Sequence, residues 1–430
     1  MSRHQVSRRA FFGASMALGV AAPTLLSARS PSEKLAVAII GAGGRGGAQL
    51  EAAGSLETVV AVCDVDDRVL SAARQKYPRA KTYCDFRAML SEMEGSIDAV
   101  MVSTPDHTHA PASAMAMRMG KHCYCEKPLT HTVSEARCLT QLARQKNLVT
   151  QMGTQIHAGD NYRRVVELIR AGTIGPIREV IVWCDKNWGG GHRPVNEDPS
   201  VPPYLHWAEW LGPASARTYH PVYLPGKWRR FWDFGSGTLG DMACHIMDVV
   251  FWALDLRYPK TIAAEGPPVD AEGCGANLKV TYEFPARGSL PPVKVTWHDG
   301  DNRPTLPSAD KEVPSGGIGA LFIGNEGMLR VDYNSRTLYP QEQFRDFKAP
   351  APSIPNSIGH HKEFFEACKS GTPTTCNFDY SGALTEAVLL GAVAYRLGKQ
   401  LDWDAVNLRA VNSPEADALI WPQYANSWTL

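Results

Sequence analysis

Three polar residues that lie far apart in the sequence have the types expected of a site that works on a hydroxyl group. Asp241 and His245 are four positions apart in the segment 235–245, so they share one face if a helix begins near Gly240. A carboxylate and an imidazole on one helix face can converge on one substrate hydroxyl. The unperturbed pKa of imidazole, about 6.5, suits proton transfer at neutral pH. Lys127 follows a short apolar run, and open α/β sheets place their ligands at such strand ends.

A glycine-rich loop supplies the second chemical feature. The apolar run Leu35–Ile40 is followed at once by G-x-G-x-x-G and then by the helix-compatible stretch Gln49–Ala53, which is the strand–turn–helix setting of a dinucleotide site. The first glycine permits the tight turn, the second lets the backbone approach a pyrophosphate, and the third allows close packing of helix and strand. The loop residues expected to bind the cofactor are Gly41, Gly43, Gly44, Arg45 and Gly46.

An acidic residue stands where a dinucleotide site needs one. The apolar run Thr58–Val62 is followed by Cys63 and then by Asp64, about twenty residues after the loop. A carboxylate at this position can accept hydrogen bonds from an adenosine ribose. A carboxylate there repels a 2′-phosphate, which favours NAD over NADP. Arg68 keeps NADP open, because a nearby arginine can bind that phosphate. The plain alternative is that Asp64 ends a strand or caps the next helix.

These residues need a scaffold, and the first part of the chain predicts it. Residues 35–155 alternate short apolar runs with helical stretches, which is typical of βαβ units and a parallel sheet. The expected strands are Leu35–Ile40, Thr58–Val62, Ala99–Ser103, His122–Cys125 and Val149–Met152. The expected helices are Asp67–Lys76, Ala110–Met119 and Ser134–Lys146.

After about residue 155 the pattern changes to amphipathic strands, which predict a large, mostly antiparallel open sheet. The expected strands are Arg178–Cys184, Asn277–Phe284, Val293–His298, Ala320–Gly324 and Met328–Val331, the last two flanking the hairpin signal Asn325-Glu326-Gly327. Ser357–Cys368 and Tyr380–Leu397 read as helices that pack back on the structure. At 430 residues, two domains are expected: a Rossmann dinucleotide-binding domain over 35–155 and an α+β substrate-binding domain over 156–430.

Residues 187–232 are rich in aromatic side chains and proline. The rings either fill a core or line a sugar site, and the sequence does not decide between these two uses. Six further residues could bind sugar hydroxyls, although each is more often structural: His206, Tyr219, His220, Arg229, Arg230 and His361.

The N-terminus resembles a twin-arginine export signal. Arg8 and Arg9 form the arginine pair, the apolar stretch Gly13–Leu26 follows, and small residues lie near Ala28. We therefore expect residues 1–30 to be a signal segment read by the twin-arginine translocase, and the protein to be periplasmic or otherwise exported. An ordinary basic tail is the alternative. Because this route carries folded proteins, the cofactor can travel already bound.

Composition excludes several other classes. Lys+Arg and Asp+Glu are equal at 44 each, so nothing predicts a basic surface for nucleic acid. No later segment has the long apolar run of a membrane span, so the mature chain is expected to have none. The histidines and the ten cysteines lack zinc-site spacing, so no metal is expected. Cys123 and Cys125 are expected to lie on one face of a strand, as core.

Taken in order, the Gly41–Gly46 loop, Glu126-Lys127-Pro128 and Asp241-x-x-x-His245 resemble the Gfo/Idh/MocA oxidoreductase family. The likeness covers residues 35–405, and its one departure is Ala243, where relatives often have glycine. The resemblance implies that the segment Ser103–His109 lies along the cofactor. It adds Thr104, Pro105, His109, Glu126 and Lys127 to the expected cofactor-binding residues.

The resemblance also implies catalytic roles. Lys127 would hold the reacting hydroxyl, His245 would be the general base, and Asp241 would bind a neighbouring hydroxyl. Against these roles, Lys127 and Glu126 could be a surface pair and Asp241 a helix cap.

Three functions follow from the resemblance. The first is an exported NAD-dependent oxidoreductase that acts on a sugar, glycoside or polyol and keeps its cofactor bound. The second is an NAD-dependent glycosidase or lyase that works by transient oxidation, elimination and reduction, with its extra base among residues 188–232. The third is a non-catalytic binding module, which the presence of both Lys127 and His245 disfavours. We also expect a homo-oligomer formed through the open sheet.

Overall fold

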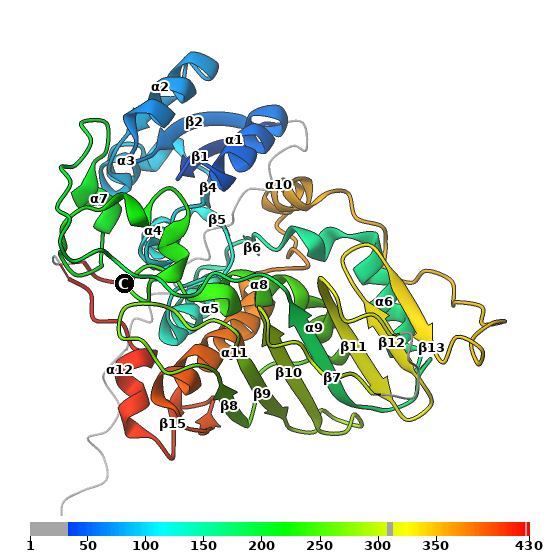
Figure 1. Ribbon diagram of the computed structural model, residues 1–430. Coiled ribbons are helices and arrows are strands. Elements are labelled where there is room, and N and C mark those ends of the chain that lie inside the picture. Colours follow the sequence, from blue (N-terminus) through cyan, green and yellow to red (C-terminus); the bar gives the residue numbers. More distant parts are fainter. Residues whose placement is uncertain (1–32, 308–312, 426–427) are drawn as a thin grey trace, which may run out of the picture.

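The computed structural model describes residues 33–307, 313–425 and 428–430, so the expected signal segment, residues 1–30, lies outside the described residues. The first domain holds a six-stranded parallel sheet in the order β3-β2-β1-β4-β5-β6 (Figure 1). Its strands are β1 (Ala36–Ile40), β2 (Thr58–Cys63), β3 (Lys81–Tyr83), β4 (Ala99–Val102), β5 (His122–Cys125) and β6 (Thr150–Met152). Every residue of β4 and β5 is buried, as expected of a parallel sheet with both faces covered.

Helices connect these strands and cover both faces of the sheet. They are α1 (Arg45–Leu56), α2 (Asp67–Lys76), α3 (Phe86–Glu92), α4 (Asp106–Arg118) and α5 (Val133–Lys146). The side chains of Cys123 and Cys125 pack into the larger core, whereas Tyr124 between them packs into a second core on the opposite face. The two cysteines thus share a face, as predicted, and all ten cysteines of the chain are free.

The second domain is built on a nine-stranded sheet in the order β13-β12-β11-β7-β10-β9-β8-β14-β15. Only the β7–β10 pair is parallel, and the other pairs are antiparallel. The strands are β7 (Ile177–Cys184), β8 (Thr261–Glu265), β9 (Lys279–Phe284), β10 (Val293–Asp299), β11 (Ile318–Gly324), β12 (Met328–Val331), β13 (Arg336–Tyr339), β14 (Leu401–Asp404) and β15 (Arg409–Ala410).

Alternation along β7 shows how the two faces of this sheet differ. Val180 and Val182 belong to the main core, on the face against which helices pack (Figure 1). Ile181 and Trp183 point to the other face and form a small separate cluster. The helices of this part are α6 (Asp160–Arg170), α7 (Trp207–Leu211), α8 (Gly237–Ile246), α9 (Asp248–Leu254), α10 (His360–Ser370), α11 (Phe378–Leu397) and α12 (Asp417–Ile420).

Helix α11 joins the two domains. It packs along α5 of the first domain and also against α8 and β8 of the second. Arg137 of α5 donates two hydrogen bonds to the carboxylate of Glu386 of α11, at 2.7 and 2.8 Å. The largest hydrophobic cluster accordingly contains side chains of both sheets, among them Val100 and Val280.

The predicted fold class, a Rossmann domain followed by an α+β domain with a mostly antiparallel sheet, is confirmed. The structure adds elements that the sequence patterns did not indicate, including α6 and the short strands β3, β8 and β13. Helix α4 begins at Asp106 instead of Ala110, and α8 begins at Gly237 instead of near Gly240. Within the described ranges, no helix combines the length and the apolarity that a membrane crossing requires.

Candidate functional site

The glycine loop joins β1 to α1 at the carboxyl edge of the parallel sheet, and its packing requires glycine. Gly41 has φ +79°, and a Cβ there would lie 2.8 Å from the backbone of Ser103. A Cβ at Gly46 would lie 1.9 Å from the carbonyl oxygen of Gly41. Gly43 has room for a Cβ, so its role is not to avoid a clash with the protein. A loop that is this closely packed and opens toward the ligand edge fits a bound pyrophosphate.

Asp64 lies at the end of β2 and holds the loop. Its Oδ2 accepts hydrogen bonds from the amides of Ala42 and Gly43 at 2.7 and 3.0 Å, and its Oδ1 accepts one from Asp66 at 3.0 Å. Burial raises the pKa of Asp64, although these three donors counteract the rise. The predicted ribose contact stays a prediction, and bracing of the loop is a role that the sequence pattern did not indicate.

Arg68 lies on the surface and is the second residue of α2. Its guanidinium pairs with Asp66 at 2.7 Å and stacks over the ring of Tyr204 at 3.6 Å. The charge that could have served a 2′-phosphate is thus already compensated by a carboxylate.

Glu126 connects the loop with the strand end of β5. Its carboxylate lies 3.4 Å from Arg45 Nε, accepts a hydrogen bond from Gln155 at 2.8 Å, and also accepts one from Gln49. A Cβ at Gly153 would lie 2.6 Å from this carboxylate, so the group is tightly enclosed. Burial raises the pKa of Glu126. The structure therefore brings the predicted residues Arg45 and Glu126 into contact. The alternative of a surface ion pair between Glu126 and Lys127 does not hold, because Lys127 pairs with Asp241 instead.

The segment after β4 lies beside the loop. The hydroxyls of Ser103 and Thr104 are buried and have no hydrogen-bond partner among the described residues. Both hydroxyls are therefore available to form hydrogen bonds with a bound ligand. Pro105 precedes α4. The ring nitrogens of His109 lie 2.8 Å from the carbonyl oxygens of Pro128 and Thr104, and burial lowers its pKa to about 4. The neutral His109 ring can donate to one of these two carbonyl oxygens and so fixes the backbone at this edge, and direct cofactor contact stays a prediction.

Lys127, Asp241 and Arg229 form one charged cluster. Lys127 Nζ donates to Asp241 Oδ1 at 2.6 Å and to the Asp241 carbonyl oxygen at 2.8 Å. Arg229 Nε donates to the same Oδ1 at 2.7 Å. Burial works to raise the pKa of Asp241, but the two cations outweigh it and hold the pKa well below its usual range. Asp241 is therefore a permanent carboxylate, and no described residue donates a hydrogen bond to its Oδ2.

His245 lies one turn after Asp241 on α8, as the spacing predicted. Burial lowers the pKa of its imidazole to about 3, and the nearby Lys127 adds to this effect. The ring is accordingly neutral near pH 7, but it is a weaker base than the unperturbed value of about 6.5 suggested. Tyr162 donates a hydrogen bond to the His245 carbonyl oxygen at 3.1 Å and fixes this end of the helix.

Asp106 is a site residue that the sequence analysis did not single out, although it lies inside a segment assigned to the cofactor edge. It is the first residue of α4 and is only 3% exposed. Burial raises its pKa from 3.8 to about 8, with Arg229 and Lys127 opposing the rise and Asp241 adding to it. The signal that could have found it is position, because the short turn that follows β4 lies at the same edge of the sheet as Lys127, and Asp106 ends that turn.

We expect Asp106→Asn to remove a pH-dependent loss of stability. The folded protein keeps a proton on Asp106 up to about pH 8, whereas the unfolded chain releases it near 3.8. The contribution of Asp106 to the free energy of unfolding is therefore full below about pH 4, decreases as pH rises to about 8, and then stays level. Thermal unfolding between about pH 5 and 9 should show the Tm of D106N rising relative to the parent up to about pH 8. A Tm difference that does not change with pH would contradict the raised pKa.

Most of the aromatic segment fills a core. One buried cluster contains Trp210, Tyr223, Trp228 and Phe231 of this segment together with the following Phe234. Of the two possible uses, these rings therefore fill a core and do not line a sugar site. Trp188 is different, because it is half-exposed and its backbone amide donates to Thr238 Oγ1 at 2.8 Å, at the start of α8. The backbone of Trp188 thus lies beside the start of α8, the helix that carries Asp241.

The other candidate residues divide into two groups. His206 and His220 pair with carboxylates of the surrounding loops, Asp67 at 3.2 Å and Glu197 at 3.0 Å. Arg230 donates to the Gly189 carbonyl oxygen at 3.1 Å, and Tyr219 packs edge-on against Trp207. His361 lies close to Arg45, and burial lowers its pKa to about 4. Of these five residues, His361 alone is placed beside the charged groups of the ligand edge, through Arg45.

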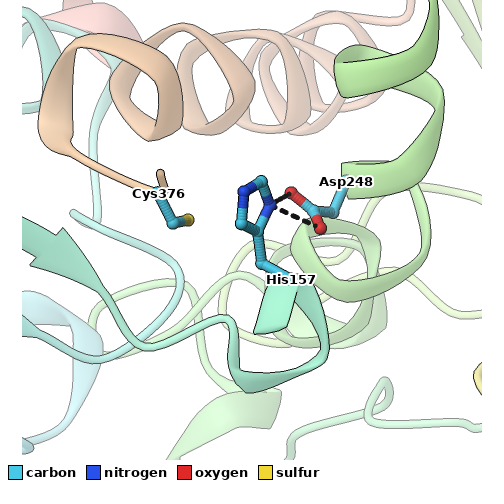
Figure 2. Close-up of side chains that lie close together, drawn as sticks. All are labelled: His157, Asp248 and Cys376. Atoms are coloured by element: carbon cyan, nitrogen blue, oxygen red, sulfur yellow. Dashed lines mark hydrogen bonds and ion pairs between the residues drawn. The ribbon is translucent and has the colours of Figure 1, made fainter. Parts of the chain in front are cut away.

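A second group of polar side chains lies in the interior, where α9 meets the segment before α11. Figure 2 shows the imidazole of His157 between Asp248 and Cys376, all three buried and with ligand-type atoms within 4.8 Å of one another. His157 Nδ1 lies 2.9 and 3.0 Å from the two Asp248 carboxylate oxygens, and the ring stacks on Trp252 at 4.2 Å. Both carboxylate oxygens of Asp248 thus lie within hydrogen-bond distance of the imidazole. Because Asp248 is the first residue of α9, this contact between His157 and Asp248 holds the start of that helix in place.

Comparisons with known proteins agree with this geometry. Residues 35–154 match the oxidoreductase family with an NAD-binding Rossmann fold, and residues 177–306 match the C-terminal alpha/beta domain of the same family. The solved structure of GenD2 from gentamicin A biosynthesis, in complex with NAD, is similar over 88% of this chain and 98% of that chain, with a TM-score of 0.59 and 19% identity.

Two curated relatives are similar over shorter stretches. Levoglucosan dehydrogenase of Pseudarthrobacter phenanthrenivorans is 25% identical over 44% of this chain and 40% of its own length. Alpha-N-acetylgalactosaminidase of Shewanella oneidensis is 31% identical over 34% of each chain. The chain thus spans about half the length, or less, of the curated relatives that it matches. With the glycine loop, the NAD-binding first domain and the matching second domain, the chain belongs to the Gfo/Idh/MocA oxidoreductase family.

Proposed function

We propose that this protein is an NAD-dependent oxidoreductase that acts on a hydroxyl group of a sugar, glycoside or polyol. The observation that carries the proposal is the cluster of Lys127, Asp241 and Arg229, with His245 one turn further along α8. The cluster lies at the carboxyl edge of the parallel sheet, next to the glycine loop. Similarity to a levoglucosan dehydrogenase supports a carbohydrate substrate.

The residues divide the work on the substrate hydroxyl. Lys127, 12% exposed and fixed by Asp241, donates to the hydroxyl oxygen and stabilises the negative charge that develops as its proton leaves. His245 is neutral and accepts that proton at a ring nitrogen. Asp241 uses Oδ2 to accept a hydrogen bond from a neighbouring hydroxyl and so orients the sugar. When bound, NAD supplies the acceptor for the hydride of the carbinol carbon.

One experiment tests the proposal directly. The purified protein is incubated with a panel of sugars, polyols and glycosides without added NAD, and the products are identified by mass spectrometry. A parallel sample is denatured and its supernatant assayed for NAD(H). The proposal expects close to one mole of NAD per mole of protein and an oxidised product. A folded protein that carries NAD but converts no compound of the panel would favour the non-catalytic binding module instead.

The 31% identity to an alpha-N-acetylgalactosaminidase favours one alternative function, an NAD-dependent glycosidase or lyase. Such an enzyme removes a C–H proton next to the transiently oxidised carbon and therefore exchanges solvent deuterium into that position. The same panel in deuterium oxide separates the two functions. A deuterium-labelled cleavage product formed without net oxidation would replace our proposal by this alternative.

We further propose that the protein is exported with its cofactor bound and that it is a homo-oligomer formed through the open sheet. Arg8→Lys combined with Arg9→Lys should then leave the protein in the cytoplasm, whereas the parent sequence should appear in the periplasm with NAD. Light scattering of the mature protein measures the oligomeric state.

A further inference from the structure

The side chain of Arg229 is held rigidly on two sides. Its Nε donates to Asp241 Oδ1 at 2.7 Å, and its guanidinium lies 4.2 Å above the ring of Trp228, which is itself buried. Stacking and an ion pair together fix the plane of the guanidinium. An arginine that only needed to reach solvent would have neither constraint.

The other edge of this guanidinium is free to bind a ligand. Nη1 makes a single hydrogen bond among the described residues, to the Gly226 carbonyl oxygen at 3.4 Å, and Nη2 makes none. The side chain is 28% exposed, whereas Asp241 is 11% exposed, so Arg229 reaches further toward solvent than the carboxylate it holds. Two parallel N–H groups in a fixed plane match the two oxygens of a carboxylate.

The charges around Arg229 do not balance. Lys127 and Arg229 share a single carboxylate oxygen of Asp241. The nearby Glu126 is already paired with Arg45. Asp106, the remaining carboxyl group, stays protonated at neutral pH because burial raises its pKa to about 8. Among the described residues, one positive charge at the substrate side of the cluster therefore lacks a partner.

We propose that Arg229 is a specificity-determining residue that binds a carboxylate group of the substrate, so that the preferred substrates are sugar acids rather than neutral sugars. The inference rests on the proposed function and narrows its substrate class. The carboxylate lies against the Nη1–Nη2 edge of Arg229, while Lys127 and His245 hold the reacting hydroxyl elsewhere on the same molecule.

The test compares acid and neutral ligands of nearly equal shape. The probes are glucuronate with glucose, galacturonate with galactose, and gluconate with sorbitol, bound to the NADH form and measured by the change in NADH fluorescence. In at least one pair the acid should bind about tenfold or more tightly than its neutral partner. Arg229→Gln should abolish this preference, because the acid loses the partner of its carboxylate and its affinity falls to that of the neutral ligand or below.

Arg230→Gln is the matched control, because it removes one positive charge at the adjacent position without touching Asp241. It should keep the preference for the acid. If Arg229→Gln weakens the acid and the neutral ligand equally, Arg229 only positions Asp241, and the inference is wrong while the proposed function stands. The same conclusion follows if no acid of the three pairs binds better than its neutral partner. If none of the six compounds binds, both the inference and the carbohydrate substrate fail.

Discussion

Lys127→Met should lower kcat by about 10²–10⁴-fold while NAD stays bound. The methionine keeps the length of the side chain but cannot donate to the substrate oxygen. Asp241 loses its 2.6 Å partner but remains paired with Arg229, so the carboxylate stays ionised and the helix keeps its place. Single-turnover rates and the NAD content of the purified variant measure the two effects separately.

Lys369→Met provides the control for the loss of an almost buried lysine. Lys369 pairs with Glu57 at 2.6 Å and is 8% exposed, but it lies on α10, away from the charged cluster. This control should lower the Tm and leave kcat nearly unchanged. A Lys127→Met variant that keeps kcat within about threefold of the parent would remove Lys127 from the reaction.

His245→Asn should reduce kcat by a similar factor, about 10²–10⁴-fold, because the proton of the reacting hydroxyl loses its acceptor. The parent enzyme should also show a distinctive pH dependence. A base acts when it is unprotonated, and burial lowers the pKa of His245 to about 3, so the imidazole stays available down to about pH 4. The acid limb of kcat/KM should therefore lie well below about pH 6.5, where an exposed histidine would place it.

His206→Asn is a suitable control, since His206 pairs with Asp67 outside the charged cluster. It should change neither kcat nor the acid limb. An acid limb near pH 6.5 in the parent that persists in His245→Asn would assign the base to another residue.

Local sequence patterns were sufficient for the parts of the fold that repeat within a few residues. The four-residue spacing of Asp241 and His245 correctly placed both on one helix, and the pattern of G-x-G-x-x-G after an apolar run correctly placed the loop between β1 and α1. Strand β3 was missed because three residues, only half-buried or exposed, leave no periodic signal. Helix α6 was missed although the apolar residues Tyr162, Val165, Val166 and Ile169 recur at helical spacing.

Contacts between distant residues were beyond the reach of the sequence alone. Lys127 and Asp241 are 114 positions apart, and nothing in either segment indicates that they form an ion pair. The shifted pKa of His245 arises from burial among elements of both domains, so residue type alone suggested too strong a base. The resemblance to a family supplied the roles of these residues, and the structure supplied their surroundings.

The hydrophobic cluster that contains Val100 and Val280 ties both sheets into one cooperative unit. Helix α11 belongs to the second half of the chain yet completes the packing around α5 in the first half. A fragment that ends near residue 155 would expose the apolar surface of α5 that α11 covers in the full chain. We therefore expect that the dinucleotide-binding half does not fold stably on its own. Unfolding should occur in a single transition. A destabilising substitution in either half should therefore lower the free energy of unfolding of the glycine loop and of helix α8 by the same amount.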